Sequence, residues 1–156
     1  MLFYTHLVFS LIISVLFLDG ITNKLVFLLF VIIFTAVPDI DSSKSKIGKK
    51  LGGISKLINF FLGHRKIFHS LLFIFLTFII LSFISPEISL AFLIGTISHI
   101  FLDALNPEGI MPFYPLKFRI KGNIKTGSFT EKLLFLVLLV ILIIISTGHT
   151  QFLKIF

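Results

Sequence analysis

The chain has 156 residues, of which 56% are hydrophobic and 13% are charged, and its net charge is +7. Soluble domains carry roughly 25% charged residues, so this chain lacks the charge that a water-facing surface needs. The composition excludes a soluble globular domain and predicts one integral membrane domain over residues 1–156. The absence of Cys excludes disulfides and thiolate metal sites.

Apolar runs dominate the chain, and each approaches the ~20 residues that an α-helix needs to cross a bilayer. Short turns around Asp19–Asn23 and at Pro86-Glu87 join the first pair of runs and the third to the fourth. The sequence therefore predicts an all-α, polytopic membrane bundle of about five transmembrane helices. The runs are Leu2–Leu18, Ile21–Val37, Ile67–Ser85, Ile88–Leu105 and Leu133–Thr147.

Two long polar segments, Pro38–Lys66 and Asn106–Lys132, separate the remaining runs and hold 12 of the 14 Lys and Arg residues. Positively charged loops stay on the cytoplasmic side of a membrane. We therefore expect both segments and the N-terminus in the cytoplasm, with the C-terminus outside.

The segment Ser42–Leu62 has a helical pattern of its own, with apolar residues at steps of three and four and lysines between them. This pattern predicts a basic amphipathic helix on the cytoplasmic membrane surface, with anionic lipid headgroups as its partner and no specific nucleic acid. A flexible loop is the alternative, because Gly52-Gly53 weakens a helix. The apolar positions are Ile47, Leu51, Ile54, Ile58 and Phe61, and the lysines are Lys44, Lys46, Lys49, Lys50 and Lys56.

The second polar segment contains helix breakers at Pro107, Pro112 and Pro115. Beyond them, Phe118–Thr126 predicts a small hairpin that turns at Gly122-Asn123. The sequence Ser128-Phe129-Thr130-Glu131 then matches a capping box, which predicts the start of the last helix.

Most histidines and aspartates fall at helix ends that the predicted topology brings to the cytoplasmic side. Each has a simpler explanation: His6 as an interfacial histidine, and Asp39 with Asp41 as a helix stop after Pro38. Ionisable groups beside apolar spans are costly, however, and usually have a partner or a function. The residues on this side are His6, Asp39, Asp41, His64, Arg65, His69, His99, Asp103 and Glu131, whereas Asp19, Glu87 and His149 fall on the other side.

His99 and Asp103 are four residues apart and share one helix face. Small residues at Ala91, Gly95 and Ser98 suit close helix packing, so this face is expected to point into the bundle. A structural hydrogen bond would explain the pair alone, but the other imidazoles and carboxylates nearby favour metal ligation.

Imidazole and carboxylate ligands without sulfur suit Zn²⁺, and also Mn²⁺ or Fe²⁺. The candidate ligands exceed what one tetrahedral Zn²⁺ needs, so either several metals share the site or some residues only orient the ligands. The candidates are His6, Asp39, Asp41, His64, His69, His99, Asp103 and Glu131.

These residues lie in motifs that resemble the YdjM-like family of membrane-bound metal-dependent hydrolases. The resemblance covers nearly the whole chain. The family usually has Gly after the His-Arg pair, where this chain has Lys66. The matching pieces are, in order, Thr5-His6, Pro38-Asp39-Ile40-Asp41, His64-Arg65-Lys66-Ile67-Phe68-His69-Ser70, Ser98-His99-Ile100-Phe101-Leu102-Asp103, Asn106-Pro107-Glu108-Gly109 and Pro115.

The resemblance implies a metal-dependent hydrolase in the plasma (inner) membrane. The pattern of His and Asp is also similar, more distantly, to that of zinc-dependent phospholipase C and P1 nuclease, which implies a phosphoester of a lipid or lipid-linked substrate. Asp39 or Asp41 would act as a ligand or general base, and Arg65 would hold a phosphate. The alternative for Arg65 is a positive anchor of the topology.

A metal transporter or a non-enzymatic metal-binding protein remains the alternative function, and a bis-histidine haem protein is a third. Transporter sites usually lie near the bilayer midplane, whereas the candidates here lie at helix ends. The haem reading would not explain the carboxylates that alternate with the histidines.

Overall fold

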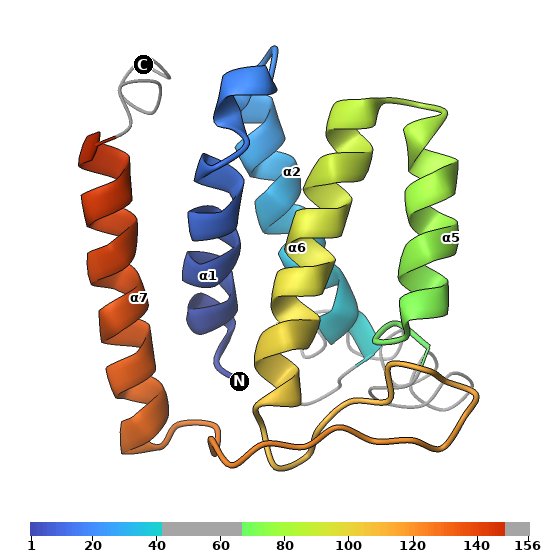
Figure 1. Ribbon diagram of the computed structural model, residues 1–156, viewed down its shortest axis with the longest axis vertical. Coiled ribbons are helices and arrows are strands. Elements are labelled where there is room, and N and C mark those ends of the chain that lie inside the picture. Colours follow the sequence, from blue (N-terminus) through green and yellow to red (C-terminus); the bar gives the residue numbers. More distant parts are fainter. Residues whose placement is uncertain (42–66, 149–156) are drawn as a thin grey trace.

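The computed structural model describes residues 1–41 and 67–148. Within these ranges the fold is all-α, as predicted (Figure 1). The predicted amphipathic helix Ser42–Leu62 lies outside the described residues. The described helices are α1 (Phe3–Val15), α2 (Lys24–Ala36), α5 (Leu71–Ser82), α6 (Pro86–Ala104) and α7 (Phe129–Gly148), with the short 3₁₀ helices η1 (Leu18–Gly20) and η2 (Val37–Asp41).

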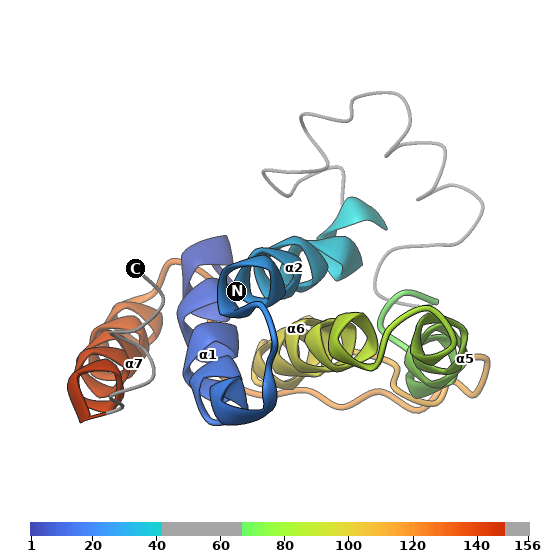
Figure 2. The same ribbon diagram turned by 90° about the horizontal axis from the view of Figure 1, so that it is seen from above.

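Successive helices run in opposite directions, so their ends gather at the two ends of the bundle (Figure 1). Met1, η2, the start of α5 and the loop of residues 105–128 share one end, which we call the loop end. The η1 turn and the α5–α6 turn share the other end. Seen from above, α7 and α5 form opposite edges, with α1 and α6 between them and α2 packed behind (Figure 2).

Two of the helices have the length and composition of membrane spans. Helices α6 and α7 contain 19 and 20 residues, or about 29–30 Å of helix, which matches a hydrocarbon core of ~30 Å. The apolar helices α1 and α5 are shorter, with 13 and 12 residues.

Some helices begin or end at residues other than the ends of the predicted apolar runs. Helix α1 stops at Val15, because the chain turns at Leu16 and enters η1. The predicted turn between the third and fourth runs is present, but it lies at residues 83–85 rather than at Pro86-Glu87, because α6 already begins at Pro86. The hydroxyl of Ser85 accepts a hydrogen bond from the Ile88 N–H, and Pro is favoured in a first helical turn.

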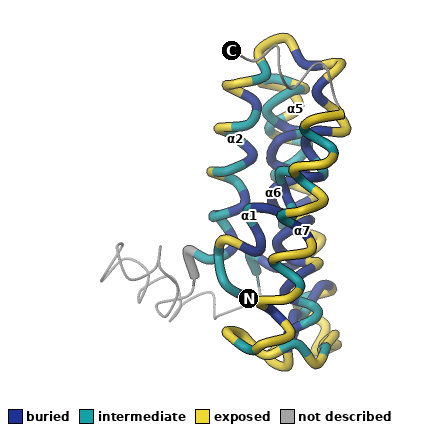
Figure 3. The backbone as a smooth tube through the Cα atoms, turned by 90° about the vertical axis from the view of Figure 1, so that its left-hand side faces the viewer, coloured by how far each residue is buried: buried dark blue, intermediate teal, exposed yellow. Residues whose placement is uncertain are grey.

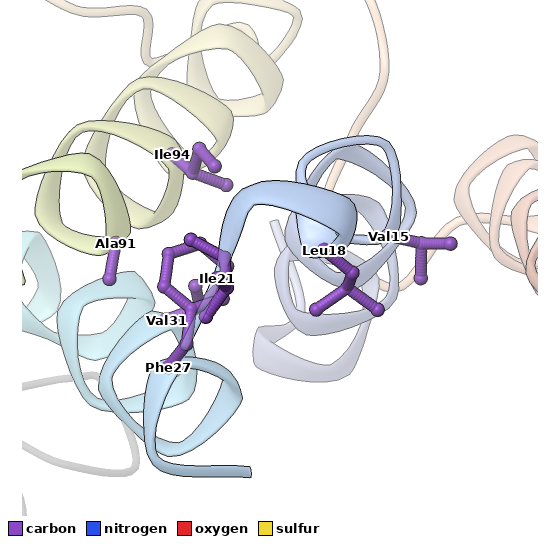
Figure 4. Packing of buried hydrophobic residues seen from close by; sticks show 7 residues of the cluster. All are labelled: Val15, Leu18, Ile21, Phe27, Val31, Ala91 and Ile94. Atoms are coloured by element: carbon purple, nitrogen blue, oxygen red, sulfur yellow. The ribbon is translucent and has the colours of Figure 1, made fainter. Parts of the chain in front are cut away.

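Helices α2 and α6 pack closely against each other. A Cβ atom added at Gly95 would lie 2.7 Å from the Thr35 amide nitrogen and 2.9 Å from the Val31 carbonyl oxygen. Only glycine fits at this contact, which confirms that the face with small residues points into the bundle. One core cluster lies beside it, formed by Val15, Leu18, Ile21, Phe27, Val31, Ala91 and Ile94 (Figure 4).

The predicted hairpin over Phe118–Thr126 is wrong. Ile120 instead exchanges both backbone hydrogen bonds with Ile110, each 3.0 Å long, and Ile124 N–H donates to the Leu105 carbonyl. The segment therefore runs back along the end of α6 rather than onto itself. Gly109, at φ 63°, makes this approach possible, since a side chain there would collide with the Ile120 carbonyl.

Candidate metal centre

Five of the predicted site residues meet at the loop end of the bundle. His6 comes from the first turn of α1, Asp39 from η2, and His69 from the turn before α5. His99 and Asp103 come from the last turns of α6. We call these residues the histidine–aspartate cluster. Its three histidines and Asp103 are at most 1% exposed, whereas Asp39 is 17% exposed at the edge.

Asp103 lies at the centre of the cluster. Its Oδ1 lies 3.5 Å from His6 Nε2, and its Oδ2 lies 3.5 Å from His69 Nε2 and 3.6 Å from His99 Nε2. The Met1 amino group also donates to Oδ1, over 2.8 Å. One buried carboxylate thus faces three imidazoles from three parts of the chain.

His99 joins the two sides of the cluster. Its ring stacks on the ring of His6 with centroids 4.0 Å apart, and it meets His69 edge-on at 5.6 Å. Its Nε2 lies 3.8 Å from Asp39 Oδ1. Both carboxylates therefore approach the same nitrogen of one ring.

The orientation of His99 is set from the backbone. Its Nδ1 lies 2.8 Å from the Thr35 carbonyl oxygen, which can only accept, so Nδ1 carries the proton. In the neutral ring, Nε2 then presents a lone pair, and it makes no hydrogen bond within the described ranges. A buried lone pair that faces two carboxylates is unfavourable unless a cation, either a second proton on the ring or a metal ion, lies between them. This arrangement is typical of a metal-ligating histidine held by its other nitrogen.

The surrounding elements fix the cluster in place. Contact of Gly95 with α2 brings His99, one turn later, against the last turn of α2. Ser70 caps α5 by accepting from the Phe73 N–H, and the Leu71 N–H donates to the Pro112 carbonyl over 2.8 Å. The loop after α6 therefore supports the turn that carries His69.

The structure gives Glu131 a different position from the cluster. It is fully buried, and its carboxylate accepts from the Leu2 and Gly127 N–H groups, each over 2.5 Å. The predicted capping box is half formed: the Glu131 N–H donates to Ser128 Oγ, but the carboxylate binds Gly127 N–H rather than Ser128 N–H. Glu131 thus ties the start of α1 to the start of α7 and positions the turn that carries His6.

Several predicted residues cannot be placed. The backbone of Asp41 ends η2, but its side chain is not described, and His64 and Arg65 lie outside the described residues. Their roles stay predictions. Asp19 and Glu87 lie at the opposite end, as predicted, where Glu87 accepts from the Thr22 N–H over 2.7 Å. Sequence reasoning missed the Thr35 carbonyl, since a backbone group leaves no signal in residue type.

Three of the cluster residues, His6, His99 and Asp103, lie close enough together to be consistent with a metal site. Zn²⁺ binds nitrogen and oxygen at ~2.0–2.2 Å, which separates neighbouring tetrahedral ligands by roughly 3.3–3.6 Å. The separation of 3.5 Å between His6 Nε2 and Asp103 Oδ1 falls in this range, and so do the separations of 3.5 and 3.6 Å from Asp103 Oδ2 to His69 and His99 Nε2. One donor atom from each of His6, His99 and Asp103 lies within 4.8 Å of the others. The buried cluster is consistent with a metal site, and the identity of the metal is open.

Comparison with known proteins matches residues 1–155 to the family described as YdjM inner membrane protein. The chain is 42% identical over 101 residues to the uncharacterized protein YvsG of Bacillus subtilis, covering 62% of this chain and 63% of that protein. It is 37% identical over 92 residues to the inner membrane protein YdjM of Escherichia coli, covering 54% of this chain and 47% of that protein. The match thus spans about half to two thirds of these relatives. No solved structure matches the chain significantly.

Proposed function

Because the chain belongs to the family of YdjM inner membrane proteins, we propose that it is a membrane-embedded metal-dependent hydrolase. We further propose that its substrate is a phosphoester of a lipid or lipid-linked molecule. The observation that supports the proposal best is the buried His99, whose Nδ1 is held by a backbone carbonyl while Nε2 faces Asp39 and Asp103. Zn²⁺ suits these ligands best, and Mn²⁺ or Fe²⁺ would also be bound.

Four of the cluster residues are proposed metal ligands, and the fifth is a candidate general base. His6, His69, His99 and Asp103 are buried and would hold the metal. A bound divalent metal would supply an activated water and would stabilise charge on phosphoryl oxygens. Asp39 is partly exposed, so it is accessible to substrate and would act as general base or as an additional ligand. Asp41 and His64 stay in the proposed site on sequence grounds, and Arg65 would hold the phosphate.

The placement of the cluster favours hydrolysis over transport. His6, Asp39, His69 and Asp103 lie at or beside helix ends, whereas transport sites usually lie near the bilayer midplane. We propose five crossings with the loop end in the cytoplasm, as the positive-inside rule predicts. On this side the exposed Lys117, Arg119 and Lys121 would attract anionic headgroups, each by ~1 kcal/mol near the surface.

The proposal is tested with protein purified in mild detergent and loaded with Zn²⁺. Release of phosphate or headgroup is measured from phosphatidic acid, common phospholipids and isoprenoid diphosphates. We expect turnover of at least one of these and its loss in Asp39→Asn, whereas Asp19→Asn at the opposite end stays active. If fully metallated protein hydrolysed none of these phosphoesters, the proposed phosphoesterase activity would be refuted.

Arg65 has its own test, because Arg65→Lys keeps the charge and loses the paired donors. We expect retained metal and a turnover lower by at least about tenfold, or ~1.4 kcal/mol of transition-state stabilisation. Turnover equal to the unchanged protein would make Arg65 an anchor of the topology only.

A further inference from the structure

An apolar groove of about 500 Å³ lies between α1 and α6. This volume falls within the ~300–1,000 Å³ of typical small-ligand sites. Ser98 is the one polar residue in its wall. The lining residues are Phe9 and Ile13 from α1 and Phe17 from the turn after it, with Leu90, Leu93, Ile94, Ile97, Ser98 and Phe101 from α6.

Along both helices, one end of the groove lies close to residues of the histidine–aspartate cluster, although none of them lines it. Phe9 lies one helical turn after His6 on α1, and Ser98 directly precedes His99 on α6. The stacked rings of Phe9 and Phe101, 5.6 Å apart, mark this end. From Leu90 to Phe101 the groove spans roughly 16 Å of α6, close to the ~15 Å hydrocarbon depth of one leaflet.

The groove has the chemistry of a site for hydrocarbon. Helix α6 is a candidate membrane span, and the walls include partly exposed Phe17, Ile97 and Phe101. With one hydroxyl in its wall, the groove offers almost no partner for the backbone of a peptide or for a polar ligand. Figure 1 shows α1 and α6 side by side, with the basic loop of residues 105–128 at the loop end.

We propose that this groove binds an acyl or isoprenoid chain of a membrane lipid whose anionic headgroup lies at the histidine–aspartate cluster. The proposal rests on the proposed function and deepens it, because it names the substrate as a lipid that enters sideways from the bilayer. Apolar walls receive the chain, and the exposed Lys117, Arg119 and Lys121 lie at the end where the headgroup would be. The lipid would reach the cluster without leaving the membrane.

The experiment uses the full chain reconstituted in phosphatidylglycerol vesicles that contain a phosphatidic acid with a photoreactive group on its acyl chain. Labelled peptides are mapped by mass spectrometry, which requires neither metal nor turnover. We expect labelling concentrated on groove residues of α1 and α6. Ile97→Trp, which fills the groove, should lower the labelling of groove residues roughly tenfold. A tenfold change corresponds to a loss of ~1.4 kcal/mol of binding free energy. Ile144→Trp, at an exposed position of α7, is the matched control and should leave groove labelling unchanged.

A second readout separates this inference from the proposed function. Ile97→Trp should slow hydrolysis of a long-chain lipid and leave hydrolysis of a water-soluble short-chain analogue unchanged. If the groove and α7 were labelled equally, or if Ile97→Trp were labelled as strongly as the unchanged protein, the proposal that the groove binds a lipid chain would be wrong. The proposed hydrolase function would not be affected by either result. Concentrated labelling without any phosphoester turnover supports the groove and refutes the hydrolase.

Discussion

Helices α6 and α7 have nearly the same length, yet they lie in opposite surroundings. In α6, 61% of the apolar stretch is buried within the bundle, whereas in α7 the share is 6%. Figure 3 shows exposed residues along α7. The buried helix is the less apolar of the two, because it carries Ala91, Gly95, Ser98, His99 and Asp103 on its inner face. In a membrane chain, small and polar residues mark the interior, and continuous Leu, Ile and Val mark the lipid face.

The largest expected difference concerns metal affinity. His99→Ala and Asp103→Ala on α6 remove proposed ligands and should lower Zn²⁺ affinity by more than ~100-fold, since residues that merely orient ligands already cost about 10–100-fold. Metal content and affinity are measured by competition with a chelator in detergent. Ser146→Ala on α7, whose hydroxyl donates to the Leu142 carbonyl of the same helix, should leave both unchanged. Full Zn²⁺ occupancy in His99→Ala would remove His99 from the site.

The second prediction tests the packing of α6. Gly95→Ala forces a Cβ against the α2 backbone, and we expect a loss of ~1–3 kcal/mol of unfolding free energy. Weaker Zn²⁺ binding should accompany it, because α6 must move away from the Thr35 carbonyl. Gly148→Ala, at the end of α7, meets none of the described residues within 4 Å and is the matched control. Unfolding in mixed detergent micelles measures both, and equal stabilities would contradict the close contact.

The third prediction concerns Glu131, the buried ionisable residue of α7. Glu131→Gln weakens the charge-assisted hydrogen bonds to the Leu2 and Gly127 N–H groups, each worth about 1.5–3 kcal/mol. We expect lower stability, with a smaller loss of Zn²⁺ affinity than His99→Ala, because the effect on His6 is indirect. If Glu131→Gln lost Zn²⁺ as fully as His99→Ala, Glu131 would belong among the ligands.

The smallest effect is expected on the outer face of α7. Val140 is 48% exposed, so Val140→Ala should change the unfolding free energy by less than ~0.5 kcal/mol. Leu138, buried against Val8 and Ile12, is the inward comparison on the same helix, and Leu138→Ala should cost more. Equal costs at both positions, again in mixed micelles, would show that α7 packs against something on its outer face.

Residue type and position predicted much of this arrangement. His6, His69, His99 and Asp103 were expected at one membrane boundary, and the structure brings them within contact of one another. The small residues Ala91, Gly95 and Ser98 also predicted that the helix face with His99 points into the bundle. Their assignment as ligands is still a prediction.

Other features had no signal in the sequence. The Thr35 carbonyl and the Leu2 N–H are backbone groups, and any residue at those positions would offer them. The false hairpin at Gly122-Asn123 arose because glycine there serves a close approach to Leu105 rather than a turn. Such tertiary pairing cannot be read from local turn preferences.

The unequal helix lengths have a consequence for the surrounding bilayer. Helix α7 spans about 30 Å, while α5 at the opposite edge is 12 residues long, or about 18 Å. Lipids respond to a short apolar surface by thinning, at fractions of a kcal/mol per Å. We therefore expect the thickness of the surrounding bilayer to decrease from the α7 edge to the α5 edge, so that the membrane is thinnest beside α5. Because α5 begins next to His69, lipid headgroups beside α5 would lie closer to the histidine–aspartate cluster. The thickness of the bilayer would therefore influence how easily a lipid headgroup reaches the cluster.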